Sequence, residues 1–68
     1  MPSTKIQMKI IETIKENQPN VLSIGGIQKR VGCSTGSVKA TVEFLEKLGH
    51  LEIQKVNDYF TVIKWTGA

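Results

Sequence analysis

The segment that most limits how this chain can fold is Gly32-Cys33-Ser34, because it interrupts a helical pattern. Ile24, Ile27 and Val31 precede it with the spacing i, i+3, i+7, which is typical of one face of a helix. Glycine can adopt the left-handed conformation that ends a helix, and a serine hydroxyl can cap the start of the next one. The segment therefore predicts a sharp turn between two helices. We expect these helices over about residues 24–31 and 35–48.

A further helix is predicted near the amino end, over about residues 4–16. Ile6, Ile10 and Ile14 recur there every four residues, as they would along one buried stripe of a helix. A chain of 68 residues can bury one modest core. We therefore expect one compact domain over residues 1–68.

From Leu51 onward the apolar residues follow a period of two, and β-branched and aromatic residues become frequent. Asn57-Asp58 supplies a tight turn, which favours a hairpin. We expect its strands over about residues 51–56 and 59–65. A two-residue closure would set Ile53 opposite Val62, whereas a slip of one residue would reverse the faces of the second strand. The two-residue closure places these apolar side chains on one face: Leu51, Ile53, Phe60 and Val62.

The chain carries nine Lys or Arg residues against six Asp or Glu residues, a net charge of +3. A basic chain favours contact with polyanions such as nucleic acid. Cys33 is the single cysteine, which excludes an internal disulfide and favours a reducing, cytoplasmic setting. No apolar run approaches the roughly 20 residues of a membrane-spanning helix, so we expect no membrane partner.

The sequence has no pattern typical of a catalytic site. It contains no cluster of metal ligands, no paired nucleophile and base, and no phosphate-binding loop. Gly25-Gly26 begins the stretch GGIQKRVG, which lacks the glycine spacing of a nucleotide-binding fingerprint. We therefore expect no enzymatic activity, no metal and no small-molecule cofactor.

The predicted elements follow the order helix, short extended segment, helix, turn, helix and hairpin, and the turn and third helix carry the residues IQKRVGCSTGSVKATVEFLEKLGHLE. In both respects the chain, over about residues 4–65, resembles the winged helix-turn-helix superfamily of DNA-binding domains found in bacterial and archaeal transcription regulators. The resemblance implies an α+β fold with three helices and a C-terminal two-stranded β-hairpin, the wing. It also implies a small DNA-binding protein that regulates transcription.

By this resemblance the helix over residues 35–48 enters the major groove of double-stranded DNA, which is wide enough to admit a helix. A helical wheel places these residues on the face turned away from the core: Thr35, Gly36, Lys39, Ala40 and Glu43. Lys39 is the strong donor there and Thr35 and Ser37 are weaker ones, whereas the face has no Arg, Asn or Gln for bidentate contact with a base. The alternative is a solvated face, on which charged residues four apart support the helix.

Other basic residues are candidates for phosphate contacts. Lys29 and Arg30 lie on the second predicted helix, and Gly26 in its first turn would let a phosphate approach the helix amides. By the resemblance, Lys55 near the hairpin tip would contact the minor groove or the DNA backbone. The alternative is a surface-charged helix with a loose first turn.

The apolar residues exceed what one small core requires. We expect Ile63 and Trp65 on the hairpin face opposite Ile53, where they would add to an apolar surface. A homodimer contact is the favoured interpretation. Its residues are Met8, Ile11, Tyr59 and Trp65. The competing interpretation places these side chains in the core. The alternative function for the whole chain is a winged-helix interaction or assembly module that does not read DNA sequence.

Overall fold

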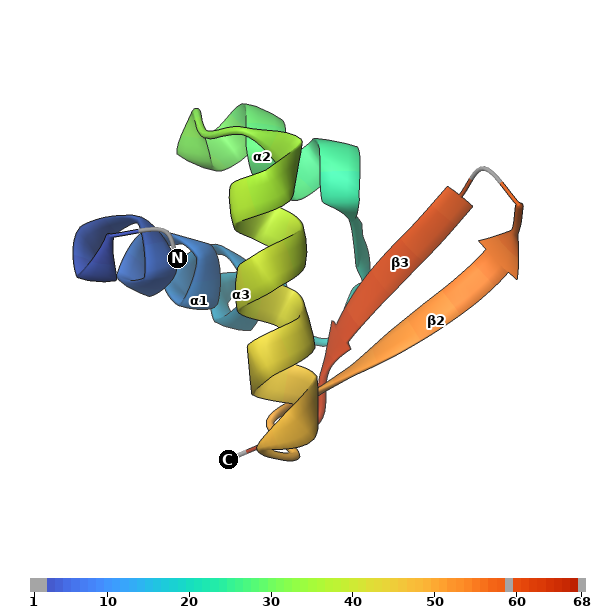
Figure 1. Cartoon of the computed structure of the whole chain (residues 1–68). Coiled ribbons are helices and arrows are strands. Elements are labelled where there is room, and N and C mark those ends of the chain that lie inside the picture. The colour runs from blue at the N-terminus through green and yellow to red at the C-terminus, as the bar shows by residue number, and fades with distance from the viewer. Residues whose placement is uncertain (1–2, 59, 68) are drawn as a thin grey trace.

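The computed structural model describes residues 3–58 and 60–67, and these form a small α+β domain of three helices and a three-stranded antiparallel sheet (Figure 1). Along the chain the elements are α1 (Thr4–Glu16), β1 (Leu22–Ser23), α2 (Ile24–Val31), α3 (Thr35–Lys47), β2 (Leu51–Asn57) and β3 (Phe60–Trp65). The first two predicted helices have the expected bounds, and the third ends one residue earlier than expected. In Figure 1 the β2–β3 hairpin extends away from the helices.

Each helix begins after a serine that caps it. The Oγ atoms of Ser3, Ser23 and Ser34 accept hydrogen bonds from backbone N–H groups three residues further on, at 3.3, 3.0 and 3.2 Å respectively. All three serines have extended backbone conformations. The first N–H groups of a helix have no partner within it, so a serine at each start satisfies one of them.

The predicted turn between α2 and α3 is present. Gly32 has φ of 77° and ψ of 41°, the left-handed conformation that lets the chain leave α2. Its N–H donates to the carbonyl of Gln28 at 2.8 Å. Ser34 then starts α3, so three residues redirect the chain, and α2 lies across the amino-terminal end of α3 (Figure 1).

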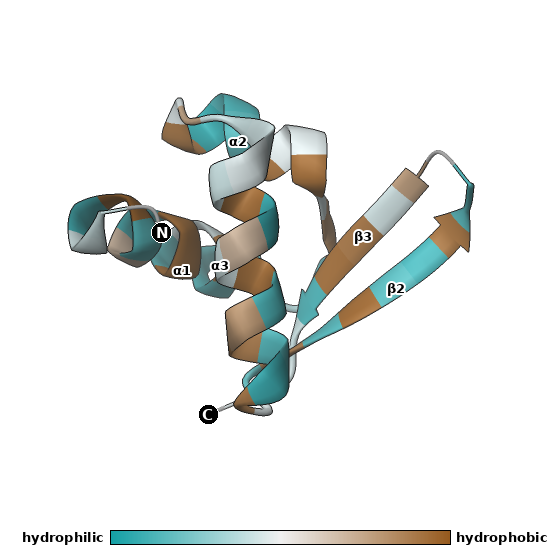
Figure 2. Ribbon diagram, viewed as in Figure 1, coloured by the Kyte–Doolittle hydropathy of each residue, from teal (hydrophilic) through white to brown (hydrophobic). Residues whose placement is uncertain are grey.

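The sheet has three strands in the order β1-β3-β2, not the two strands that we predicted. Leu22 pairs with Ile63 and Ser23 pairs with Val62, so the short extended segment before α2 becomes an edge of the sheet. β3 is therefore the central strand. Figure 2 shows hydrophilic and hydrophobic residues alternating along β2, whereas β3 carries a continuous hydrophobic stretch.

The predicted register of the hairpin is wrong by one residue. Ile53 pairs with Ile63 and not with Val62, and Leu51 pairs with Trp65. The ladder shifts between Lys55, which pairs with Thr61, and Asn57, which pairs with Phe60. Val56 is therefore an extra, bulged residue on β2, and it reverses the faces that a regular closure gives to β3. The predicted strand residue Tyr59 lies outside the described residues.

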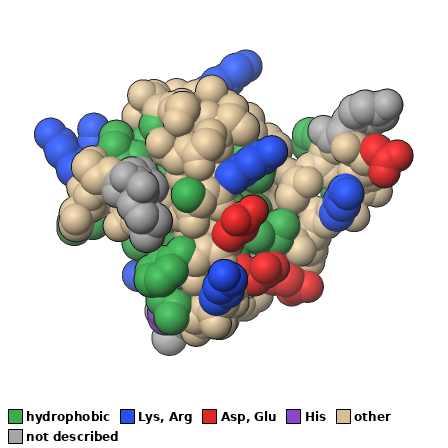
Figure 3. All heavy atoms as spheres, in the orientation of Figure 1, with side chains coloured by type: hydrophobic (Ala, Val, Ile, Leu, Met, Phe, Trp, Pro, Cys, Tyr) green, Lys and Arg blue, Asp and Glu red, His purple; other side chains and the backbone are tan. Residues whose placement is uncertain are grey.

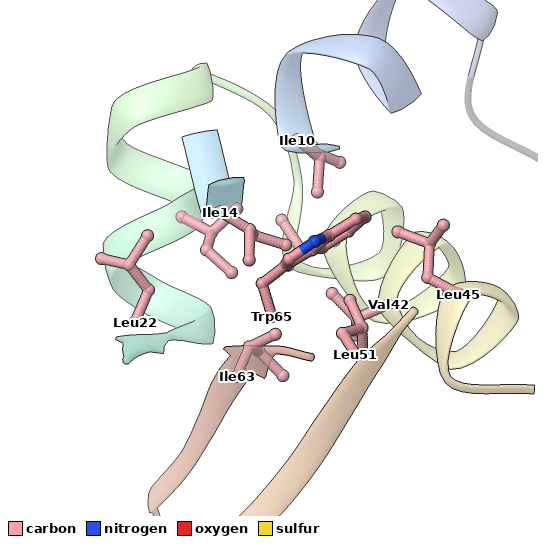
Figure 4. Packing of buried hydrophobic residues seen from close by; sticks show 10 residues of the cluster. Ile10, Ile14, Leu22, Val42, Leu45, Leu51, Ile63 and Trp65 are labelled. Carbon is pink, nitrogen blue, oxygen red and sulfur yellow. The ribbon is translucent and has the colours of Figure 1, made fainter. Parts of the chain in front are cut away.

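The core lies where α1, α2, α3 and the inner face of the sheet meet (Figure 4). It contains these buried apolar residues: Ile10, Ile14, Leu22, Ile27, Val38, Val42, Leu45, Leu51, Ile63 and Trp65. Trp65 is only 8% exposed, so the prediction that it lies on an exposed apolar face is wrong. The physical reason is packing: the observed register turns Ile63 and Trp65 toward the helices, and the bulge at Val56 accommodates that register.

Two polar side chains also contact the faces of the Trp65 ring. The His50 ring stacks on the indole with 5.8 Å between ring centroids and 5° between planes. The Lys15 Nζ lies 5.6 Å from the centroid of the indole, within the range of a cation–π contact. These contacts link the end of β3 to the loop between α3 and β2 through His50, and to α1 through Lys15.

β2 is the other edge of the sheet, and α3 contacts it. The Ile53 N–H donates to Glu46 Oε2 at 3.3 Å, so a helix carboxylate satisfies one backbone group of this edge. Unpaired strand edges favour association with other strands, and a charged side chain there opposes it. No helix formed by the described residues is long and apolar enough to cross a bilayer.

Candidate functional site

The exposed face of α3 is the candidate site. Val38, Thr41, Val42 and Leu45 on its opposite side are buried. Of the residues predicted to face outward, four are exposed: Thr35, Gly36, Lys39 and Glu43. Ala40 and Ser37 are half-buried. Of the five residues predicted to face outward, four are therefore exposed and Ala40 is partly covered.

Charges of both signs alternate along this face. Lys39, Glu43 and Lys47 occupy successive turns of α3, and Figure 3 shows basic and acidic side chains interspersed over the helix. A carboxylate repels phosphate groups, so Glu43 makes the second half of the helix less suited to a polyanion than the first. On α3, the residues that can approach a polyanion are therefore those before Glu43.

The Ser37 hydroxyl is engaged in the helix cap. The Ser37 N–H donates to Ser34 Oγ at 3.2 Å, and the two hydroxyl oxygens lie 3.0 Å apart. This hydrogen-bonded pair closes the start of α3. Ser37, predicted as a weak donor to bases, is therefore placed in a structural role.

Gln28 of α2 joins this face, and sequence reasoning missed it. The Thr35 hydroxyl donates to Gln28 Oε1 at 2.8 Å, which brings the amide beside the first residue of α3. The prediction that the face has no Gln applies to α3 itself, and Gln28 comes to this surface from α2. No signal in the sequence indicates this contact, because Gln28 and Thr35 lie on different helices and meet only when α2 and α3 pack together.

The two basic residues of α2 have different surroundings. Arg30 Nη1 donates to Asn17 Oδ1 at 3.2 Å, while Asn17 Nδ2 donates to the carbonyl of Val21 at 3.2 Å. Arg30 thus links α2 to the loop after α1. Lys29 is exposed on the same helix. Of the two predicted phosphate contacts, Lys29 is the more available one.

Gly25 and Gly26 differ in the space around them. A Cβ added to Gly26 would lie 3.2 Å from Ser23 Oγ and 3.5 Å from Leu22 Cδ2, which is tight packing against the cap of α2. A Cβ at Gly25 would meet nothing within 4 Å. Packing thus accounts for Gly26, and Gly25 is the glycine beside open space.

Gly25 borders a hollow between α2 and the hairpin. Its volume is about 250 Å³. The lining residues are Ser23, Ile24, Gly25, Phe60 and Thr61. Lys55, the predicted contact of the hairpin, is exposed on β2 opposite Thr61. Near this hollow the hairpin therefore carries the ammonium group of Lys55 and the partly exposed ring of Phe60.

The predicted dimer residues do not form one exposed patch. Met8 is exposed, Ile11 packs against the core, Trp65 is buried, and Tyr59 lies outside the described residues. Other apolar side chains are exposed instead. Phe44 and Leu48 lie one turn apart at the end of α3, and Leu48 is 55% exposed.

The fold and this surface define a small α+β domain that presents one exposed helix with a lysine near its start. Comparison with protein-family models found no matching family, and comparison with curated proteins found no similar sequence. Among the described residues, no three His, Cys, Asp or Glu side chains are grouped so that they could hold a metal ion. The function must therefore be inferred from the geometry of α2, α3 and the hairpin.

Proposed function

We propose that this chain is a winged helix-turn-helix protein that binds double-stranded DNA and regulates transcription. The first half of α3 would enter the major groove, and the β2–β3 hairpin would be the wing. The observation that carries the proposal is the exposed start of α3, which the turn at Gly32 directs away from the core. A groove about 12 Å wide accepts a helix presented in this way.

Charge supports the same orientation. Lys39 on α3, Lys29 on α2 and Lys55 on the hairpin are all exposed. Phosphate contacts from such residues fix the register of a protein on a duplex, and the first turn of α2 at Gly25 offers backbone amides as further donors. Glu43 would repel nearby phosphates, so only the part of α3 that precedes it would enter the groove.

The test measures binding of the 68-residue chain to a fluorescent 20-base-pair duplex at several salt concentrations. Neutralising about five or six phosphates gives a slope of log K against log salt of about −5. Lys39→Ala should weaken binding and flatten the slope by about one, because one phosphate or base contact is lost. Lys9→Ala removes the same charge from the exposed side of α1 and should change binding little. Salt-independent affinity, or equal losses from the two variants, would contradict the proposal.

The second candidate is an interaction or assembly module. Phe44, Leu48 and Met8 favour it, because each is an apolar side chain about half exposed. Exposed apolar side chains that gather into a patch are typical of protein contacts. Self-association in sedimentation experiments without any binding of duplex DNA would favour this function over the first.

A further inference from the structure

The hydrogen bond between Thr35 and Gln28 decides which groups the start of α3 can offer to a base. The Thr35 hydroxyl donates to Gln28 Oε1 at 2.8 Å, and it has a single proton to donate. Thr35 is exposed and Gln28 is half-buried, so the pair is reached from outside. While this bond is made, Thr35 Oγ1 offers acceptor lone pairs to a partner and no donor.

Gln28 supplies the complementary group. Its Oε1 is occupied by Thr35, whereas Nε2 carries two N–H donors. The two residues come from different helices, yet together they present an acceptor and a donor side by side. A single Asn or Gln side chain presents the same combination when it recognises adenine in the major groove.

From this geometry we infer that Gln28 and Thr35 act together to recognise an adenine, which rests on the proposed function of binding duplex DNA. Adenine presents N7 as an acceptor and the N6 amino group as a donor in the major groove. Gln28 Nε2 would donate to N7, and Thr35 Oγ1 would accept from the N6 amino group. Guanine presents two acceptors, N7 and O6, so its O6 would face the lone pairs of Thr35 Oγ1 and be disfavoured.

The pair also compensates for what α3 lacks. On its exposed face Lys39 is the strong donor, and a lysine ammonium donates to guanine or phosphate without an acceptor of its own. A contact with adenine that uses both a donor and an acceptor would therefore need a residue outside α3. Gln28 reaches the face from α2 because Gly32 folds the two helices together.

The experiment starts with selection of duplexes from a randomised pool by the full chain. In the selected duplex, each adenine is replaced in turn by 7-deazaadenine, which lacks the N7 acceptor, and by purine, which lacks the amino group. One adenine is expected at which each replacement weakens binding about tenfold, the size of a base contact worth about 1.4 kcal/mol. Gln28→Ala should remove the effect of 7-deazaadenine there, and Thr35→Val should remove the effect of purine.

Controls separate this role from a structural one. Thr35→Ser keeps the hydroxyl and should keep the sensitivity to purine. Lys29→Ala should weaken binding to every duplex alike and leave the selected sequence unchanged. Circular dichroism and thermal unfolding of Gln28→Ala and Thr35→Val establish that both variants are folded before binding is measured.

The outcomes distinguish recognition of the adenine from DNA binding itself. Selection of a duplex with equal sensitivity to the modified adenines in the wild type and in both variants overturns the adenine reader and leaves DNA binding intact. Failure of the wild-type chain to bind any duplex overturns both. Loss of sensitivity at one adenine, restricted to the two variants, supports the inference.

Discussion

The α2–α3 turn and the tip of the β2–β3 hairpin each join two elements over a few residues, but different interactions determine their geometry. In the first, Gly32 and Ser34 supply a left-handed residue and a cap within three positions. In the second, Val56 is an extra residue on β2, and the ladder shifts at this residue so that the apolar faces of both strands meet the core. The first geometry follows from local backbone chemistry, whereas the second follows from which side chains the core accepts.

This difference also separates the sources of stability. Gly32 acts through its own backbone angles, and a Cβ added there would meet no atom within 4 Å. Trp65, at the far end of the hairpin, acts through its contacts with the helices. Substitutions in the two regions should therefore change the free energy of unfolding by different amounts and for different reasons.

The largest effect is expected from Trp65→Ala, which removes the largest side chain of the core. Loss of a buried aromatic residue lowers the free energy of unfolding by about 3–5 kcal/mol. The indole Nε1 is buried with no hydrogen-bond partner among the described residues, so apolar packing accounts for the loss. Phe60→Ala, on the same strand but 48% exposed, should cost less than about 1 kcal/mol. Urea denaturation followed by circular dichroism measures both, and equal losses would contradict the assignment of Trp65 to the core.

An intermediate effect is expected at the turn. Gly32→Ala places a Cβ on a residue with φ of 77°, which costs about 1–2 kcal/mol. Gly25→Ala is the matched control, because its Cβ enters open space in a helix and should stabilise by up to about 1 kcal/mol. Opposite shifts of the urea midpoints are the expected result. Shifts of the same sign would indicate that backbone angle does not control the turn.

The smallest effect is expected from deletion of Val56. This residue is exposed, and without it Asn57 would continue the regular ladder to Phe60. The stability should change by less than about 1 kcal/mol, since the core contacts keep the register. Ile53 and Ile63 form a pair without ladder hydrogen bonds, as the Ile53 N–H bonds to Glu46, so their Hα atoms lie close. Their Hα–Hα NOE should persist in the deletion variant. An NOE from Ile53 to Val62 in its place would show that the bulge controls the register.

The sequence was sufficient to predict the helices because their signals are local. Ser23, Gly32 and Ser34 act on backbone groups within four residues of themselves. The strand β1 could not be predicted, because Leu22–Ser23 is too short to favour a strand until β3 lies beside it. The prediction of the hairpin register failed for the same reason, since the position of an unpaired residue depends on packing between distant segments.

The residues of the candidate site also differ in whether a local pattern in the sequence predicts them. Helical period placed Thr35, Gly36, Lys39 and Glu43 on the exposed face of α3. It could not place Gln28, because the contact with Thr35 requires the crossing geometry of two helices. A wheel drawn for one helix contains no information about a neighbour that reaches across its end.

Trp65 is the single tryptophan of the chain, and it lies where α1, α3 and the sheet meet. The molecule thus carries one intrinsic fluorophore at the junction of its elements, with the imidazole of His50 stacked against it and the ammonium of Lys15 near its ring. Its emission reports on the integrity of the whole interior without any added label. A ligand that separated the helices from the sheet would be detected optically, even if it bound far from the indole.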